Sequence, residues 1–133
     1  MKIKDGDRPR LSDGEWKLMT PLWEQRDLTL AQLEHLLKAD TGWTHNTIIV
    51  MLYRLRDKGA LDYKTVGRAK HFFPLLERES VTLIEAEDFL DRVYGGSIGL
   101  FVNSMLDSDK LTAADIDELY AIIREAAGKD TKD

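Results

Sequence analysis

Apolar residues recur at helical spacing in three short segments within the first 60 residues. The first segment follows Ser12, which has the form of a capping box with Glu15, and its apolar face consists of Trp16, Met19, Leu22 and Trp23. Pro21 lies inside this predicted helix, where it removes a backbone hydrogen bond and favours a kink. A second capping box begins at Thr29, and the helix after it has an apolar face of Leu30, Leu33, Leu36 and Leu37.

The third segment begins at Thr44 and is predicted to end near Lys58, because Gly59 favours a helix C-terminus. Its apolar face consists of Ile48, Met51, Leu52 and Leu55, and its opposite face of His45, Asn46, Ile49, Tyr53 and Arg56. Two runs of β-branched and aromatic residues then flank Gly67, at residues 61–66 and 70–73. They predict a two-stranded hairpin that ends at Pro74, which cannot donate a further backbone hydrogen bond.

Residues 77–133 have the pattern of three more helices. The first two are predicted over about 78–94 and 97–106, separated by Gly95-Gly96, and the third from Thr112 onward. These helices are too short and too apolar to close a core by themselves, so we expect a second copy of the chain to cover them in a homodimer. The alternative is packing onto the first domain of the same chain. The predicted dimerisation residues are Leu90, Val93, Ile98, Phe101, Val102, Met105, Ile116, Leu119, Tyr120 and Ile123.

Three short helices followed by a hairpin have the order of a winged helix-turn-helix domain. We therefore predict a mainly α fold with a small β-hairpin. A winged helix-turn-helix DNA-binding domain at residues 11–76 is followed by a helical dimerisation domain at residues 77–133. Residues 1–10 are predicted to form a disordered N-terminal segment. The alternative fold is a helical bundle with a solvated basic face.

A net charge of −5 would argue against a nucleic-acid partner if the charges were spread evenly along the chain, but they are not. Residues 1–76 carry a net charge of +3, and residues 77–133 carry −8. Residues 41–76 alone hold six basic side chains and two acidic ones. A basic first domain suits contact with a polyanion, from which the acidic second domain is repelled. Chance partition of a solubilising surface is the alternative.

The predicted recognition helix begins with hydroxyl and amide side chains, which suit both base edges and phosphates. Basic side chains further along this helix and on the predicted wing suit phosphate contacts. The predicted DNA-binding residues are Thr44, His45, Asn46, Thr47, Arg54, Arg68 and Lys70.

Other kinds of chemistry have little support in the sequence. The absence of cysteine excludes disulfides and thiolate metal sites, and it fits a cytoplasmic location. Residues 95–99 match the G-x-S-x-G string of serine hydrolases, but they lie between predicted helices rather than at a strand-to-helix turn. The three histidines, His35, His45 and His71, lack a compact metal-ligand spacing. No signal peptide and no apolar run of the ~20 residues needed to cross a bilayer are visible. We therefore expect no enzyme, cofactor, metal or membrane partner.

Five longer motifs occur in order along the chain: LSDGEWKLMTPLW, GWTHNTIIVMLYRLRDKGAL, GRAKHFFPL, FLDRVYGGSIGLFVNSML and LTAADIDELYAIIREA. Together they resemble the penicillinase-repressor (BlaI/MecI/CopY) family over about residues 11–127. The resemblance implies a homodimeric winged-helix repressor of beta-lactam resistance or metal-homeostasis genes. It also implies that Asn46 and Thr47 lie where members contact operator bases, and that Arg68 is the basic residue at the wing tip.

Three features depart from the family pattern. Ile49 stands where other members often carry a longer polar or basic side chain, which leaves the operator sequence open. Members controlled by a membrane beta-lactam sensor are cut at an Asn-Phe bond, and the alignment puts Ser104-Met105 there. The motif for a regulatory protease is therefore absent from this chain. Copper-responsive members carry a C-terminal cysteine cluster, which this chain also lacks.

These observations predict a homodimeric DNA-binding transcriptional repressor that occupies a palindromic operator, of beta-lactam resistance or stress-response genes. Its expected partners are double-stranded operator DNA and a second copy of itself. The alternative is a winged-helix module that binds a protein partner and no DNA. A hydrolase that uses Ser97 is a third hypothesis, which turnover of an activated ester would test.

Overall fold

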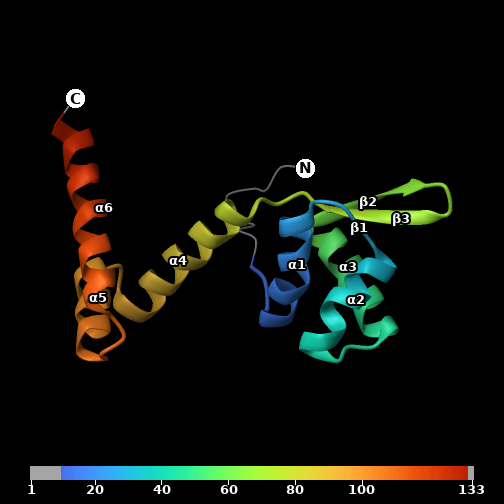
Figure 1. Cartoon of the computed structure of the whole chain (residues 1–133), viewed down its shortest axis with the longest axis horizontal. Coiled ribbons are helices and arrows are strands. Elements are labelled where there is room, and N and C mark those ends of the chain that lie inside the picture. Colours follow the sequence, from blue (N-terminus) through green and yellow to red (C-terminus); the bar gives the residue numbers. More distant parts are fainter. Residues whose placement is uncertain (1–9, 132–133) are drawn as a thin grey trace. The chain divides into compact units, whose positions relative to one another are not determined.

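The computed structural model describes residues 10–131, so the predicted disorder of residues 1–9 lies outside the described residues. The chain divides into two compact units, Met1–Ala86 and Glu87–Asp133, and the boundary falls within a helix. Helices dominate both units, and a small antiparallel sheet belongs to the first (Figure 1). The predicted mainly α fold with a small β element is confirmed.

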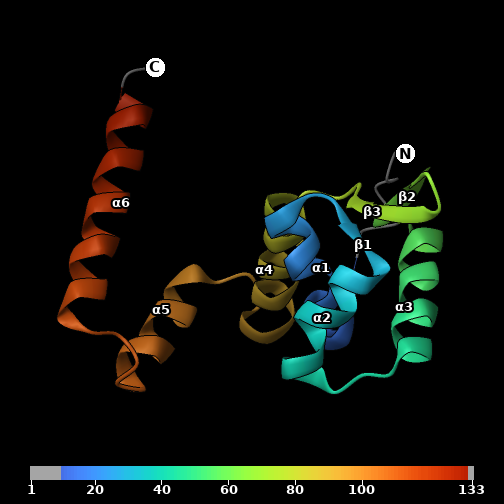
Figure 2. The same cartoon turned by 45° about the vertical axis from the view of Figure 1, so that its right-hand side comes forward.

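The first unit contains helices α1 (Asp13–Gln25), α2 (Leu30–Thr41) and α3 (His45–Lys58), with strands β1 (Leu28–Thr29), β2 (Leu61–Val66) and β3 (Ala69–Pro74). In Figure 1 the β2–β3 hairpin extends beyond the three helices, as a wing does. Figure 2 turns the molecule so that α2 and α3 separate, and the short connection between them is visible. This connection runs through Gly42, whose φ of 68° ends α2 in the left-handed region.

The three helices begin at the residues that the sequence predicts. Ser12 Oγ accepts a hydrogen bond from the Glu15 amide at 3.2 Å, and Glu15 Oε1 accepts one from the Ser12 amide at 2.9 Å. The second capping box, at Thr29, also has both of its bonds, and Thr44 caps α3. Since each cap satisfies amides that a helix leaves unpaired, these short polar motifs determine where the helices start.

The core of the first unit is a single cluster of aliphatic and aromatic side chains from all three helices, the sheet and the start of α4 (Arg78–Tyr94). Three of the four residues on the predicted apolar face of α2 contribute to it, but Leu36 is 46% exposed. Helix α1 continues through Pro21 without interruption. The core residues are Leu18, Met19, Leu22, Trp23, Leu28, Leu33, Leu37, Ile48, Leu52, Leu55, Ala60, Leu61, Phe72, Leu76 and Val81.

The sheet has three strands, and the prediction of a two-stranded hairpin was incomplete. Strand β1 pairs antiparallel with β3 through Leu28 and Thr29, opposite Phe72 and His71, which gives the order β1-β3-β2. A strand of two residues has no alternating pattern of its own. It forms because packing of α1 and α2 brings the connection between them to the free edge of β3.

A buried hydrogen bond connects α1 to the segment between the sheet and α4. Trp23 Nε1 donates to the backbone carbonyl of Leu76 at 2.9 Å, and both residues are buried. Arg26 reinforces this contact with two bonds to the Glu77 carboxylate, at 2.9 and 3.0 Å. The Arg26 guanidinium lowers the pKa of Glu77 by hydrogen bonding. Val81, in the first turn of α4, completes the core.

The second unit comprises the end of α4, α5 (Ile98–Asp107) and α6 (Ala113–Thr131). Gly95 and Gly96, with φ of 57° and 84°, separate α4 from α5, and Ser97 caps α5. Phe89, Tyr94 and Phe101 form a cluster with ring centroids 5.5–6.2 Å apart. No described side chain of this unit is buried. None of the described helices is long and apolar enough to span a membrane.

We predict that Trp23→Phe lowers the free energy of unfolding by about 1–3 kcal/mol, because the buried Leu76 carbonyl loses its hydrogen-bond partner. Urea denaturation measures this change. Trp16→Phe is the matched control, since Trp16 contacts the Trp23 ring edge-on at 5.3 Å but lies only partly in the core. Equal losses in the two variants would show that ring volume, and not the hydrogen bond, carries the effect.

Candidate nucleic-acid interface

Helix α3 presents one face to the core and the opposite face to solvent. Ile48, Leu52 and Leu55 are buried, as their spacing predicts. At about 100° per residue, Asn46, Val50 and Tyr53 lie on the side farthest from this stripe. Val50 is 48% exposed, although it is apolar. The first turn of α3, from Thr44 to Thr47, is exposed throughout.

Lys58, at the C-terminal end of α3, is held against α1. Its Nζ donates to Glu15 Oε1 at 2.7 Å and to the Arg10 carbonyl at 3.1 Å. Partial burial alone would raise the pKa of Glu15, but the hydrogen bonds from Lys58 and Ser12 outweigh it, and the pKa is lowered. Glu15 thus caps α1 and also anchors α3, which makes it part of the support of the exposed face.

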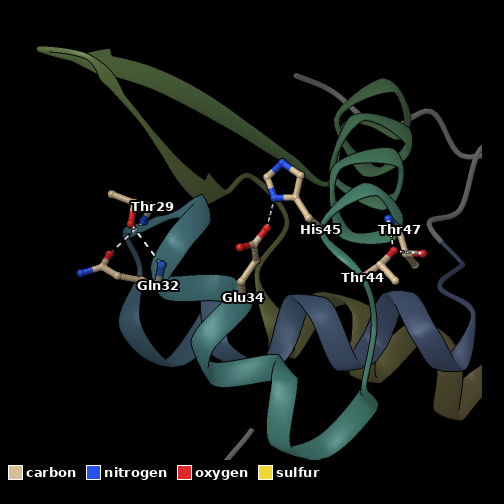
Figure 3. Close-up of polar contacts among 6 residues, drawn as sticks. All are labelled: Thr29, Gln32, Glu34, Thr44, His45 and Thr47. Atoms are coloured by element: carbon tan, nitrogen blue, oxygen red, sulfur yellow. Dashed lines mark hydrogen bonds and ion pairs between the residues drawn. The ribbon is translucent and has the colours of Figure 1, made fainter.

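The first turn of α3 is ordered by its own hydrogen bonds and by α2. Thr44 Oγ1 accepts from the Thr47 amide at 3.2 Å and lies 3.0 Å from Thr47 Oγ1. His45 Nδ1 contacts Glu34 Oε1, which projects from α2 (Figure 3). Figure 3 also shows the Thr29–Gln32 capping box at the start of α2. Asn46 is exposed between the two held residues, His45 and Thr47.

The wing is joined to α3 by alternating cations and aromatic rings. The Arg56 guanidinium lies 4.9 Å from the Tyr63 ring centre, and Lys70 Nζ lies 4.6 Å from the same ring. Lys70 also donates to Tyr53 Oη at 2.8 Å, and this hydrogen bond raises the pKa of Lys70. Because the ring faces carry partial negative charge, this stack holds β2 and β3 against the exposed side of α3.

Half of the basic side chains in residues 41–76 have acidic partners. Arg56 donates to Asp62 at 2.7 Å, Lys58 pairs with Glu15, and Lys64 lies 3.7 Å from Asp27. The hydrogen bond from Arg56 lowers the pKa of Asp62. The other half have no carboxylate within ion-pair distance in the part of the chain that the structure describes, and they are Arg54, Arg68 and Lys70. These three are the cations that the sequence assigns to DNA contact.

A hollow of about 470 Å³ lies between α3, the start of α2 and the β3 side of the wing. Ile49, Leu52 and Tyr53 line it from α3, and Arg68, Lys70 and Phe72 from the wing, together with the start of α2. The two wing cations without an acidic partner, Arg68 and Lys70, therefore border a concave surface next to the exposed face of α3. Among the side chains that the structure describes, no group of three or more histidine, aspartate or glutamate residues is able to hold a metal ion.

All seven predicted DNA-binding residues are exposed, Arg68 and Lys70 line the hollow beside α3, and the structure adds two candidates that the sequence did not assign. Arg54 and Thr47 lie on one flank of the exposed helix face, and His45 lies on the other. Val50 is a further candidate, because an exposed apolar side chain can contact a thymine methyl group. The sequence could have indicated this, because Val50 does not share the helical spacing of the buried residues Ile48, Leu52 and Leu55. Glu34 had no sequence signal, since its contact depends on how α2 and α3 pack.

Comparison with known proteins identifies the family. The model of the penicillinase repressor family matches residues 11–125. The chain belongs to the penicillinase repressor family. The penicillinase repressor of Bacillus licheniformis is 31% identical over 117 residues, which cover 88% of this chain and 91% of the relative. The methicillin resistance regulatory protein MecI of Staphylococcus aureus is 22% identical over 121 residues, covering 91% and 98%.

Solved structures of the family resemble the first unit. The DNA-binding domain of the repressor BlaI has a TM-score of 0.51 and 29% identity, covering 55% of this chain and 89% of that domain. The monomeric Bacillus licheniformis BlaI bound to the blaP half-operator gives a TM-score of 0.50 with the same identity and coverage. The winged-helix prediction is thereby confirmed, and this family member is a DNA-binding transcriptional repressor.

We predict that Tyr63→Leu loosens the wing, because it removes the ring between Arg56 and Lys70. Backbone amides of β2 and β3 should exchange faster with solvent, and the free energy of unfolding should fall by about 1–2 kcal/mol. Tyr53→Phe is the control: it keeps a ring next to Lys70 and removes only the hydroxyl, so exchange in the wing should change less. Unchanged exchange in Tyr63→Leu would show that strand pairing alone holds the wing.

Proposed function

We propose that this repressor reads DNA with the first turn and the exposed face of α3, and that Arg54, Arg68 and Lys70 contact phosphates. The observation that carries the proposal is the absence of carboxylate partners for these three cations, within the described residues, while the other basic side chains of the same segment are paired. A cation without an acidic partner keeps its full attraction for phosphate. The exposed Asn46 amide is suited to a bidentate contact with adenine.

We infer that the repressor acts as a homodimer through its second unit. No described side chain of Glu87–Lys129 is buried, although this stretch is rich in apolar residues. Val93, Ile98, Tyr120 and Ile123 are each more than half exposed, and the other predicted dimerisation residues are half-buried. A second copy that covers these faces supplies the missing core.

A twofold dimer presents two recognition helices, and this favours a palindromic operator with half-sites about one helical turn apart. Occupation of such a site within a promoter blocks transcription sterically. The relatives that the chain matches are named for penicillinase and methicillin resistance. We propose target genes of this kind, in beta-lactam resistance or a related stress response.

Asn46→Ala is expected to relax base preference, with a loss of about 1–3 kcal/mol of discrimination at one base pair of each half-site.

Arg68→Ala should weaken binding to all sequences alike and reduce the slope of log affinity against log salt by about 0.9 for each phosphate that is no longer neutralised. Fluorescence anisotropy on duplexes from the upstream region of the gene, at several salt concentrations, measures both. Unchanged discrimination in Asn46→Ala, or no binding even at low salt, would contradict the proposal, and the latter would favour a protein partner.

Ile123→Asp should convert the dimer to a monomer, since a carboxylate would be buried at the proposed apolar interface. Sedimentation equilibrium measures the change in mass. Glu118→Lys is the matched control, because residue 118 lies on the opposite side of α6 from Ile116, Leu119 and Ile123. Dimer formation that survives Ile123→Asp, or that Glu118→Lys abolishes equally, would place the interface elsewhere.

A further inference from the structure

Glu34 is a carboxylate on the side of the molecule that the proposed function turns toward DNA. It projects from α2, and its side chain is 32% exposed. A carboxylate near phosphates is repelled by them, so by itself this residue weakens DNA binding. Its contact is with His45, in the first turn of α3, whose side chain is 58% exposed. The other residues of that turn, Thr44, Asn46 and Thr47, are uncharged.

The contact determines which imidazole nitrogen carries the proton. An ionised carboxylate can only accept hydrogen bonds, and Glu34 meets Nδ1 of His45. Nδ1–H is therefore the donor, and in the neutral imidazole Nε2 carries a lone pair. Figure 3 shows Nε2 pointing away from Glu34. In its neutral form, His45 thus presents a hydrogen-bond acceptor at the exposed end of the recognition helix.

We propose that Glu34 is a specificity-determining residue that acts by positioning His45 as an acceptor for a base amino group. This inference rests on the proposed function, in which α3 enters the major groove. Adenine N6 and cytosine N4 donate hydrogen bonds there, whereas guanine O6 and N7 and thymine O4 only accept. An Nε2 lone pair therefore selects adenine or cytosine at the base it meets and disfavours guanine and thymine. The carboxylate thus lowers the affinity for every duplex and, through His45, increases the discrimination between bases.

Glu34→Lys tests the proposal because it reverses the hydrogen bond. A lysine ammonium can only donate, so it meets Nδ1 as an acceptor and leaves the proton on Nε2. His45 then presents a donor, which guanine, thymine and adenine N7 can accept and cytosine cannot, so the disfavoured bases should change from guanine and thymine to cytosine. Selection from a random duplex library at about pH 8.5, where histidine side chains are generally neutral, should show this change at one position of each half-site. The expected change in relative preference is about tenfold or more.

The added positive charge of Glu34→Lys also raises affinity for every duplex, so a control separates the two effects. In a His45→Ala background the same substitution should raise overall affinity and leave base preference unchanged. Glu34→Ala, which removes the partner without replacing it, leaves both tautomers available and should weaken the discrimination against guanine and thymine without creating one against cytosine as strong as that of Glu34→Lys.

The tautomer is measured separately on the free protein, from the imidazole ¹⁵N chemical shifts of His45 at the same pH. The wild type should carry its proton on Nδ1, and Glu34→Lys should carry it on Nε2. A wild-type proton on Nε2 would overturn the proposal. It would also be overturned if Glu34→Lys changed the selected sequences in the wild-type background no more than in the His45→Ala background. If the wild type selects no duplex at all, the proposed function fails, and this inference fails with it.

Discussion

Burial of Ile48, Leu52 and Leu55 is the interaction on which the rest of the first unit depends. These three side chains from one stripe of α3 sit in a core that α1, α2 and the sheet supply. Truncating any one of them to alanine would cost about 2–5 kcal/mol, a large part of the stability of a small domain. Because a helix is rigid, burying this stripe also points Asn46, Val50 and Tyr53 outward. The packing that stabilises the fold therefore also orients the exposed face of α3, which is proposed to contact DNA.

Electrostatics then divides the basic side chains into two groups. Lys58, Arg56 and Lys64 lie against carboxylates and hold elements together: α3 to α1, α3 to β2, and β2 to the connection after α1. The Arg56–Tyr63–Lys70 stack adds the wing to the same assembly. A net charge of −5 for the whole chain hides this division. What matters for a polyanion is where cations remain without acidic partners, and within residues 41–76 these are Arg54 on α3 and Arg68 and Lys70 on the wing.

The second unit is held by local aromatic contacts and has no buried core among its described side chains. Its aromatic cluster of Phe89, Tyr94 and Phe101 gives the α4–α5 junction local order, and two glycines in the left-handed region allow the turn between these helices. Yet its apolar faces stay exposed in a single chain, whereas the first unit closes a core of fifteen residues. The contrast explains why a dimeric role is inferred for one unit and not for the other.

Sequence alone determined the elements whose signals are local. The capping residues Ser12, Thr29 and Thr44 each accept a hydrogen bond from the amide three residues further on, so the helix starts follow from neighbouring side chains. Helical spacing likewise predicted the buried stripe of α3, and element order predicted the winged helix. Only the tertiary structure decided features that join distant segments: the pairing of β1 with β3, the exposure of Leu36, and the contact of Glu34 with His45. Those features depend on how helices pack, and no short stretch of sequence carries that geometry.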